Sequence, residues 1–298
     1  MGIKVINLKK YDVSLYDDKE IIFESLSPVT RYFFIINKLT KEIETMPEYK
    51  NNILFFRGQA NSDWKVLPGI FRNDYLTREH EIIRTSISRN PNVFSNNFDF
   101  SLLSKLQHYG LPTRLLDVTN NPLVALYFAC DKENNNDGAV FIKITNPTYP
   151  ESDQTRILSY LSSIDLEEEY VIYRKLDPLI NILSLKQHSL TDSIKYIEKH
   201  SMSHFVKADM NHERIIRQSG AFLLCGCINS KNNNEIIELH KFSEDQQYLF
   251  DFKIIINKNE KDLILKELDI LNINESTLFP ELEHQLNYVK WKELKFPK

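Results

Sequence analysis

The chain carries, at residues 55–59, the stretch Phe55-Phe56-Arg57-Gly58-Gln59, in which a short apolar run ends in an arginine and a glycine. Residues 53–57 are predicted to form a buried strand that presents Arg57 at its end. Gly58 has no side chain, so backbone or a ligand can approach it closely. A guanidinium can donate two hydrogen bonds to a phosphate or a carboxylate. The stretch therefore predicts either an anion contact at Arg57 or an ion pair with a buried acid, for which Asp117 is a candidate.

A second stretch follows, and it runs Gln107-His108-Tyr109-Gly110-Leu111-Pro112-Thr113-Arg114-Leu115-Leu116-Asp117. Residues 101–108 carry leucines at helical spacing, and Gly110 is expected to end that helix. Pro112 favours extended backbone in the residue before it, so the polar side chains here project from a constrained loop. His108 is either functional or held structurally at the carbonyl end of the helix. Arg114 and Asp117 belong either to a site or to an ion pair that stabilises the fold.

The third stretch, Asn121-Pro122-Leu123-Val124-Ala125-Leu126-Tyr127-Phe128-Ala129, begins with a strong helix-start signal. An asparagine side chain can cap free backbone amides, and proline is tolerated at the first helical position. Residues 123–129 are thus predicted to form a buried helix. Residues 134–138 are expected to form a turn or loop, and residues 139–144 alternate as a strand that returns to the sheet.

The remainder of the chain carries weaker signals of secondary structure. Residues 150–205 are mostly helical in periodicity, with a weak strand at 170–173. Three strands are expected at 214–227, 235–242 and 248–256, with an asparagine-rich turn at 232–234. A helix up to Leu271 and a last helix with Pro280 in its first turn complete the chain. Because strands lie on both sides of the helical segment, we predict an α+β fold with one central mixed or antiparallel sheet flanked by helices.

Composition limits the classes of function. The 298 residues are 42% hydrophobic and carry a formal net charge of −4, which argues weakly against non-specific DNA binding but leaves room for a local basic cleft. The first ten residues lack a signal-peptide pattern and no segment is long and apolar enough to cross a membrane, so we expect a cytoplasmic protein without membrane association. Cys130, Cys225 and Cys227 are expected to be buried thiols, the last two on one face of a strand.

Several familiar chemistries have no support in the sequence. The chain has no Gly-rich phosphate loop, no His-Glu-x-x-His and no Gly-x-Ser-x-Gly. The polar residues of the later chain match no template for metal ligands, namely His188, His200, His204, His212 and Glu213. We therefore expect a site that works without a metal.

Together the three stretches resemble the FRG domain, a mainly bacterial family named after its Phe-Arg-Gly signature. The run Arg214-Ile215-Ile216-Arg217-Gln218-Ser219-Gly220-Ala221-Phe222 resembles a second FRG pattern, and residues 272–280 resemble a C-terminal stretch of such proteins. The resemblance implies one FRG-type domain over residues 1–298. Its core motifs lie in 50–145 and 210–256, with a helical insert at about 150–205 and C-terminal helices at about 258–298.

The FRG domain in turn looks like a relative of the diphtheria-type ADP-ribosyltransferases, which hold NAD with an arginine or histidine on an early strand. This resemblance implies that Arg57 contacts NAD and that Gln218, on a third strand, replaces the usual glutamate. Because a glutamine cannot act as a base, His108 or Glu213 would have to supply one. The implied catalytic residues are Arg57, His108 and Gln218, and the implied NAD-binding residues are Arg57, Gly58, Gln59, Tyr109, Thr113 and Arg114.

NAD is then a substrate, no metal is needed, and the acceptor is a protein or a nucleic acid. Relatives of this kind act as toxins or phage-defence effectors, with an antitoxin or sensor protein as a further partner. Two other interpretations stay open. One is a nucleic-acid-binding or metal-independent nuclease module in which Arg57, His108 and Arg114 grip phosphate. The other is a structural interaction domain whose signature residues stabilise the fold.

Overall fold

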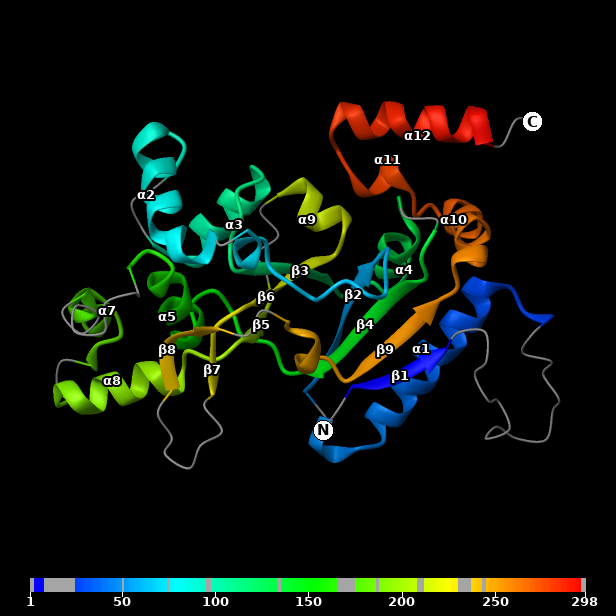
Figure 1. Cartoon of the computed structure of the whole chain (residues 1–298). Coiled ribbons are helices and arrows are strands. Elements are labelled where there is room, and N and C mark those ends of the chain that lie inside the picture. Colours follow the sequence, from blue (N-terminus) through cyan, green and yellow to red (C-terminus); the bar gives the residue numbers. More distant parts are fainter. Residues whose placement is uncertain are drawn as a thin grey trace.

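The computed structural model describes residues 3–7, 25–49, 51–73, 75–94, 98–132, 135–165, 175–185, 188–207, 212–229, 237–242 and 245–295. Among these residues, one mixed seven-stranded sheet forms the centre of the molecule (Figure 1). Its strand order is β1 (Lys4–Asn7), β9 (Phe252–Ile256), β4 (Gly138–Thr145), β2 (Ile53–Gln59), β3 (Leu115–Thr119), β6 (Gly220–Leu224) and β5 (His204–Val206). Among the described strands of this sheet, β1 and β9 pair in parallel and the other neighbouring strands pair antiparallel. The predicted α+β class with a mixed sheet is confirmed.

One group of helices covers the half of the sheet that contains β2, β4 and β9. These helices are α1 (Pro28–Glu44), α4 (Pro122–Cys130) and α10 (Lys261–Ile270), and their apolar side chains share one core with Phe56, Ile142 and Ile254. α4 lies directly on the strands, and there is no room for a side chain between them at two glycines. A Cβ at Gly58 would lie 1.9 Å from the backbone oxygen of Ala125, and one at Gly138 would lie 2.1 Å from that of Ala129. Gly58 therefore serves close helix packing.

A second group of helices packs around the β3–β6–β5 half (Figure 1). It consists of α2 (Glu79–Arg89), α3 (Phe100–His108), α5 (Asp153–Leu161), α7 (Asp177–Ile182) and α8 (Leu190–Lys199). The apolar side chains of these helices share a core with strand residues of this half of the sheet, namely Leu115, Phe222 and Leu224. The helical periodicity expected between residues 150 and 205 is thus confirmed for the described part of that segment.

The remaining elements are short or peripheral. β7 (Cys227–Asn229) and β8 (Ile237–Phe242) form a separate two-stranded sheet, and α9 (Glu213–Arg217), α11 (Glu275–Leu278) and α12 (Leu282–Lys295) lie at one side of the central sheet (Figure 1). Single turns of 3-10 helix are found at Pro47–Tyr49, Gly69–Phe71, Tyr75–Arg78, Gln247–Leu249 and Lys258–Glu260. No described helix has both the length and the apolar character required to span a membrane.

Several local predictions are confirmed. The side chain of Asn121 accepts a hydrogen bond from the amide of Leu123 at 2.9 Å and so caps α4, with Pro122 in the first position. Gly110 follows α3 with a φ of 84°, which favours glycine. Cys130 and Cys225 are fully buried, and burial raises the pKa of both thiols.

Other predictions were wrong. β2 continues two residues beyond Arg57, so this arginine lies inside the strand. The expected strand at 214–227 is instead α9, β6 and β7, and Cys225 and Cys227 do not share a strand because β6 ends at Leu224. Residues 237–242 pair with β7 outside the central sheet. Pro280 precedes α12 and is not inside it. The strand expected at 170–173 and the turn at 232–234 lie outside the described residues.

Candidate functional site

The central sheet is nearly divided between β2 and β3. These strands share one residue pair, Phe56 with Thr119, whereas β2 and β4 pair along their whole length. We call this junction the seam. Two side chains replace ladder hydrogen bonds there: Asn120 Nδ2 donates to the carbonyl oxygen of Leu54 at 2.9 Å, and Arg57 Nη1 donates to the carbonyl oxygen of Asp117 at 2.6 Å. Arg57 thus holds β3 beside β2.

The burial and contacts of Arg57 fit a structural role as well as they fit a ligand-binding role. Its side chain is largely enclosed, its Nε is buried without a hydrogen-bond partner in the described chain, and burial lowers the pKa of the guanidinium. The nearby Asp117 acts in the opposite direction and favours the charged form. Arg57 contacts the backbone of Asp117 and not its carboxylate, which is exposed. The alternative of an ion pair between these two side chains was therefore wrong.

The carboxylate of Asp117 is exposed and is fixed by a short chain of hydrogen bonds. Gln107 Nε2 donates to Asp117 Oδ1 at 2.8 Å, and Thr113 Oγ1 donates to Gln107 Oε1. Thr113 in turn accepts a hydrogen bond from the amide of Leu115 at 3.2 Å. The loop between α3 and β3 therefore sets the position of one acidic group at the seam. Gln107 was not among the expected site residues, although it directly precedes His108 in the second stretch.

A cavity of about 90 Å³ opens beside Asp117, and we call it the seam pocket. Side chains from α3, β3, α9 and β6 line it. In the described chain these residues are Ser104, Gln107, His108, Asp117, Val118, Arg214, Ile215, Gln218, Gly220, Ala221 and Phe222. The pocket thus gathers a carboxylate, an imidazole, a guanidinium and two carboxamides around a space that accepts one ring or one phosphate group.

His108 lines the seam pocket and is the last residue of α3. Its ring stacks on that of His212, with centroids 5.0 Å apart and planes within 11°. Partial burial lowers the pKa of His108 below the ordinary value of 6.5, and the charges of His212 and Arg214 lower it further. At neutral pH His108 is therefore uncharged and able to accept a proton.

Arg214 and Gln218 bring α9 into the pocket. The guanidinium carbon of Arg214 lies 4.8 Å from the ring centroid of Phe279, which fixes the arginine by a cation–π contact. Gln218 ends α9, and its Nε2 donates to the carbonyl oxygen of Leu278 at 3.2 Å. The expectation that Gln218 lies on a third strand was wrong. It nevertheless faces the seam pocket from the turn that precedes β6.

The other expected site residues lie elsewhere. Arg114 is fully buried and forms a two-point ion pair with Glu79, so its partner is not Asp117. Gln59 is buried and donates to the carbonyl oxygen of Lys65 at 3.2 Å. Tyr109 is 60% exposed and faces a different cavity over α2. Glu213 is bound by Arg217 at the surface.

The histidines of the later chain do not assemble. His204 contacts Thr155, His200 packs on Tyr196, and His212 stacks on His108. In the described ranges no group of three or more His, Cys, Asp or Glu side chains is placed to hold a metal ion. The side chains in the seam pocket are instead suited to acid–base and electrostatic chemistry on a small polar group.

Comparison with known proteins identifies one family. Residues 52–138 match the family model of the FRG domain, so this part of the chain, which holds β2, α2, α3, β3 and α4, is an FRG domain. The resemblance to this family is confirmed for these residues. Neither the curated proteins nor the solved structures include a match to the chain.

Proposed function

We propose that the FRG domain of this chain, completed by α9 and β6, transfers the ADP-ribosyl group of NAD to a macromolecule at the seam pocket. The observation that carries the proposal is the exposed carboxylate of Asp117, which Gln107 fixes beside His108 and Gln218. A fixed carboxylate can stabilise the positive charge that develops on the ribose as the glycosidic bond opens, and a neutral imidazole can take the proton of the acceptor.

In this reaction the bond between the ribose C1′ and the nicotinamide nitrogen breaks, and nicotinamide leaves with the electron pair. The ribose carbon gains positive charge, which the carboxylate of Asp117 stabilises. An acceptor oxygen or nitrogen then bonds to C1′ and loses its proton to a base. His108 fits that base because its lowered pKa keeps it neutral at pH 7.

Gln218 and Arg214 bind substrate in the proposal, and Arg57 positions a catalytic group. The carboxamide oxygen of Gln218 accepts a hydrogen bond from a ribose hydroxyl, while its Nε2 stays on Leu278. Arg214 neutralises a phosphate of NAD. Arg57 acts through the backbone of Asp117. Because the seam pocket measures about 90 Å³, it takes the reacting end of NAD, and the remainder extends outward past α9.

A second candidate is metal-independent phosphodiester cleavage, and the stacked rings of His108 and His212 favour it. One imidazole would remove a proton from the attacking oxygen, the other would protonate the leaving oxygen, and Arg214 would stabilise the charge on phosphorus. This reaction needs no NAD. Arg114, which the sequence suggested for phosphate binding, has no part in it because Glu79 and the core enclose it.

Incubation of the protein with adenylate-labelled NAD and a cell lysate tests the proposal and identifies the acceptor class. We expect label in the protein or nucleic-acid fraction with wild type and none with Asp117→Asn, a substitution that preserves the acceptor atom for Gln107. Cleavage of nucleic acid by the wild type in the presence of a chelator and without NAD, with no transfer of label, would favour the second candidate instead. As a toxin or defence effector, the protein would also arrest bacterial growth on expression, and Asp117→Asn would relieve the arrest.

A further inference from the structure

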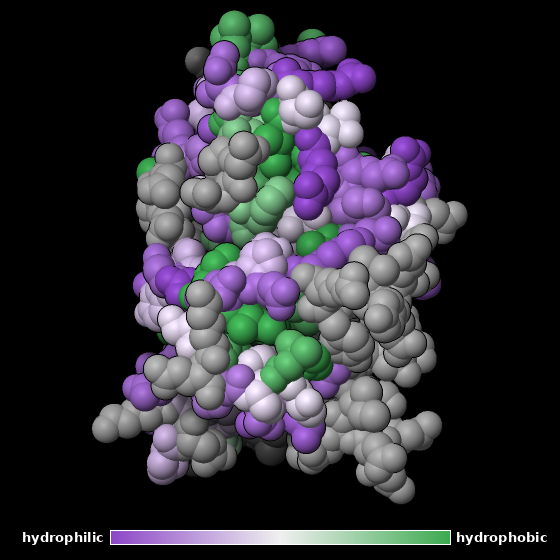
Figure 2. All heavy atoms as spheres, turned by 90° about the vertical axis from the view of Figure 1, so that its left-hand side faces the viewer, coloured by the Kyte–Doolittle hydropathy of each residue, from purple (hydrophilic) through white to green (hydrophobic). Residues whose placement is uncertain are grey.

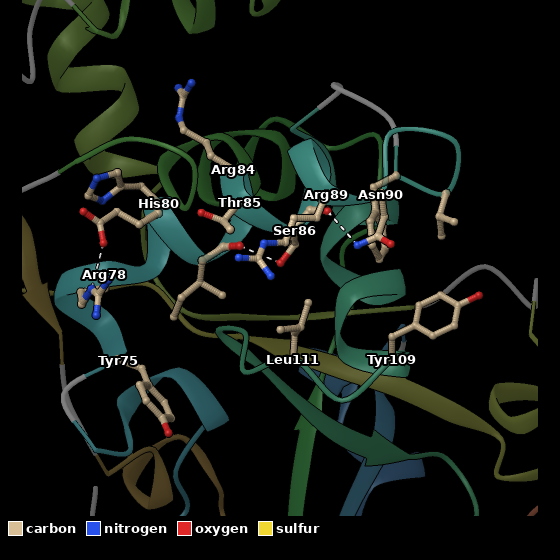
Figure 3. A pocket seen from close by; sticks show the side chains of 14 residues that line it. Tyr75, Arg78, His80, Arg84, Thr85, Ser86, Arg89, Asn90, Tyr109 and Leu111 are labelled. Atoms are coloured by element: carbon tan, nitrogen blue, oxygen red, sulfur yellow. Dashed lines mark hydrogen bonds and ion pairs between the residues drawn. The ribbon is translucent and has the colours of Figure 1, made fainter.

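A second and much larger cavity, of about 1060 Å³, runs along α2 and is separate from the seam pocket. We call it the α2 groove. Its walls come from the turn at Tyr75–Arg78, from α2, and from the loop after α3 (Figure 3). Leu111 lies at its base between Tyr75 and Tyr109 in this view. Figure 2, which faces the side of α2, α7 and α8, shows exposed apolar atoms bordered by strongly hydrophilic ones.

The α2 groove is basic, in contrast to the chain as a whole. Three of the described residues that line it are arginines, Arg78, Arg84 and Arg89, and one is acidic, Glu81. Arg78 pairs with Glu81 at 2.8 Å, and Arg84 is held by the carbonyl oxygen of Ser163 and by the ring of Phe98. Arg89 makes no side-chain hydrogen bond or ion pair within the described chain. A local excess of arginine in a protein of net charge −4 indicates an anionic ligand.

Two tyrosines add flat apolar surface next to these charges. Tyr75 is 41% exposed and Tyr109 is 60% exposed, values that are high for such large side chains. The ring of Tyr109 is fixed edge-on against Phe94, with centroids 5.9 Å apart. An exposed ring held in one orientation beside arginines is the surface on which unpaired nucleobases stack.

The α2 groove and the seam pocket approach each other at the end of α3 without sharing a described lining residue. His108 lines the pocket and Tyr109 lines the groove, and their rings are 5.3 Å apart. We infer that the α2 groove binds single-stranded nucleic acid, with phosphates at Arg84 and Arg89 and bases on Tyr75 and Tyr109. This site stands without the proposed transferase activity. The bound strand would also be the acceptor of the ADP-ribosyl group, because it would reach His108 from the groove. This second part of the inference rests on the proposed function.

Binding is measured with a fluorescently labelled oligothymidylate and no NAD. We expect the wild type to bind it with an affinity that falls as salt rises. Arg89→Ala should lower the slope of log affinity against log salt by about 0.7, the value for one lost phosphate contact on a single strand. Lys41→Ala, which removes an exposed charge from α1, should leave the slope unchanged.

The tyrosines provide the second arm. Tyr109→Ala should weaken binding roughly 5- to 100-fold, whereas Tyr109→Phe, which keeps the ring, should retain it. Tyr149→Ala removes a tyrosine that is 56% exposed elsewhere and serves as the control. No oligothymidylate binding at low salt would overturn the inference. So would equal binding of polyglutamate, which has charge but no bases, or equal losses in the control variants. Because the assay contains no NAD, its outcome is independent of the transferase proposal.

Discussion

At the scale of single residues, Arg57 is the clearest example of a signature residue with a structural contact. Its guanidinium donates to a backbone oxygen across the seam, where the strands share one residue pair. Removing the guanidinium leaves the carbonyl of Asp117 without this partner and the strands less firmly joined. The family signature therefore has a physical explanation that does not depend on a ligand.

We predict that Arg57→Met lowers the free energy of unfolding by about 1.5–3 kcal/mol, the range for a hydrogen bond made by a charged group. Urea denaturation followed by circular dichroism measures the change. Arg156→Met, at an exposed position of α5, is the matched control and should change stability by less than about 0.5 kcal/mol. Equal stability of the two variants would show that Arg57 does not hold the seam.

His108 is the residue whose chemistry depends most on its neighbours. Partial burial, His212 and Arg214 all disfavour its charged form. As a base it works when neutral, so a rate that depends on it should fall only as pH drops through a pKa below 6.5. Removal of one positive neighbour should move that pKa upward.

We therefore predict that Arg214→Ala raises the pKa of His108, as followed by NMR titration of its imidazole protons. The control is Arg217→Ala, which removes an arginine of the same helix that pairs with Glu213 and should leave the pKa of His108 unchanged. A pKa that stays unchanged or falls in Arg214→Ala would contradict the assigned position of Arg214 beside His108.

At the scale of elements, the buried pair of Arg114 and Glu79 joins β3 to α2. Both side chains are enclosed and the contact has two hydrogen bonds. Loss of one member leaves an unpaired buried charge, whereas loss of both leaves none. The pair should therefore behave as a unit.

We predict that Arg114→Met and Glu79→Leu each lower the free energy of unfolding by about 3–5 kcal/mol, and that the double variant loses less than either single one. Chemical denaturation of the three variants closes this cycle. Additive losses in the double variant would mean that the two side chains contribute independently of each other.

The elements also show why some local structure was predictable. The cap and proline of α4 and the leucine spacing of α3 are signals carried by neighbouring residues, and both helices were expected. α9 has five residues and contains Ile215 and Ile216, whose β-branched side chains suggested a strand. The pairing of β8 with β7 depends on contacts between distant segments, which no local pattern specifies.

At the scale of the whole molecule, we expect the buried His204 to lower stability in acid. This residue is enclosed between Thr155 and the carbonyl oxygen of Met202, and burial lowers its pKa to about 4. The unfolded chain binds a proton here near pH 6.5, well before the folded chain does. The stabilising effect is thus complete above pH 6.5 and is lost as pH falls toward 4.

We predict that His204 accounts for a loss of up to roughly 3 kcal/mol of stability between pH 6.5 and 4. In His204→Asn this part of the pH dependence should disappear, as measured by urea denaturation at a series of pH values. His188→Asn, at an exposed position, should retain the dependence of the wild type. The same slope in both variants would exclude His204 as its origin.

The candidate site was predictable in part. The second stretch contains Gln107, His108 and Asp117, and they come together because α3, its loop and β3 follow each other along the chain. Arg214 and Gln218 were recognised as a second pattern, but their approach to the pocket from a helix end depends on tertiary packing. Glu79 as the partner of Arg114, and His212 as the partner of His108, lie far away in sequence and gave no local signal.

Release of nicotinamide from NAD by the purified protein tests most directly whether the seam pocket uses NAD. We expect release by the wild type, with a loss of at least about a hundredfold in Asp117→Asn. That variant should remain folded, as circular dichroism would show, because Asp117 is exposed and asparagine keeps the bond to Gln107. A wild type that releases no nicotinamide, and whose melting temperature NAD does not raise, would contradict the claim that the seam pocket uses NAD.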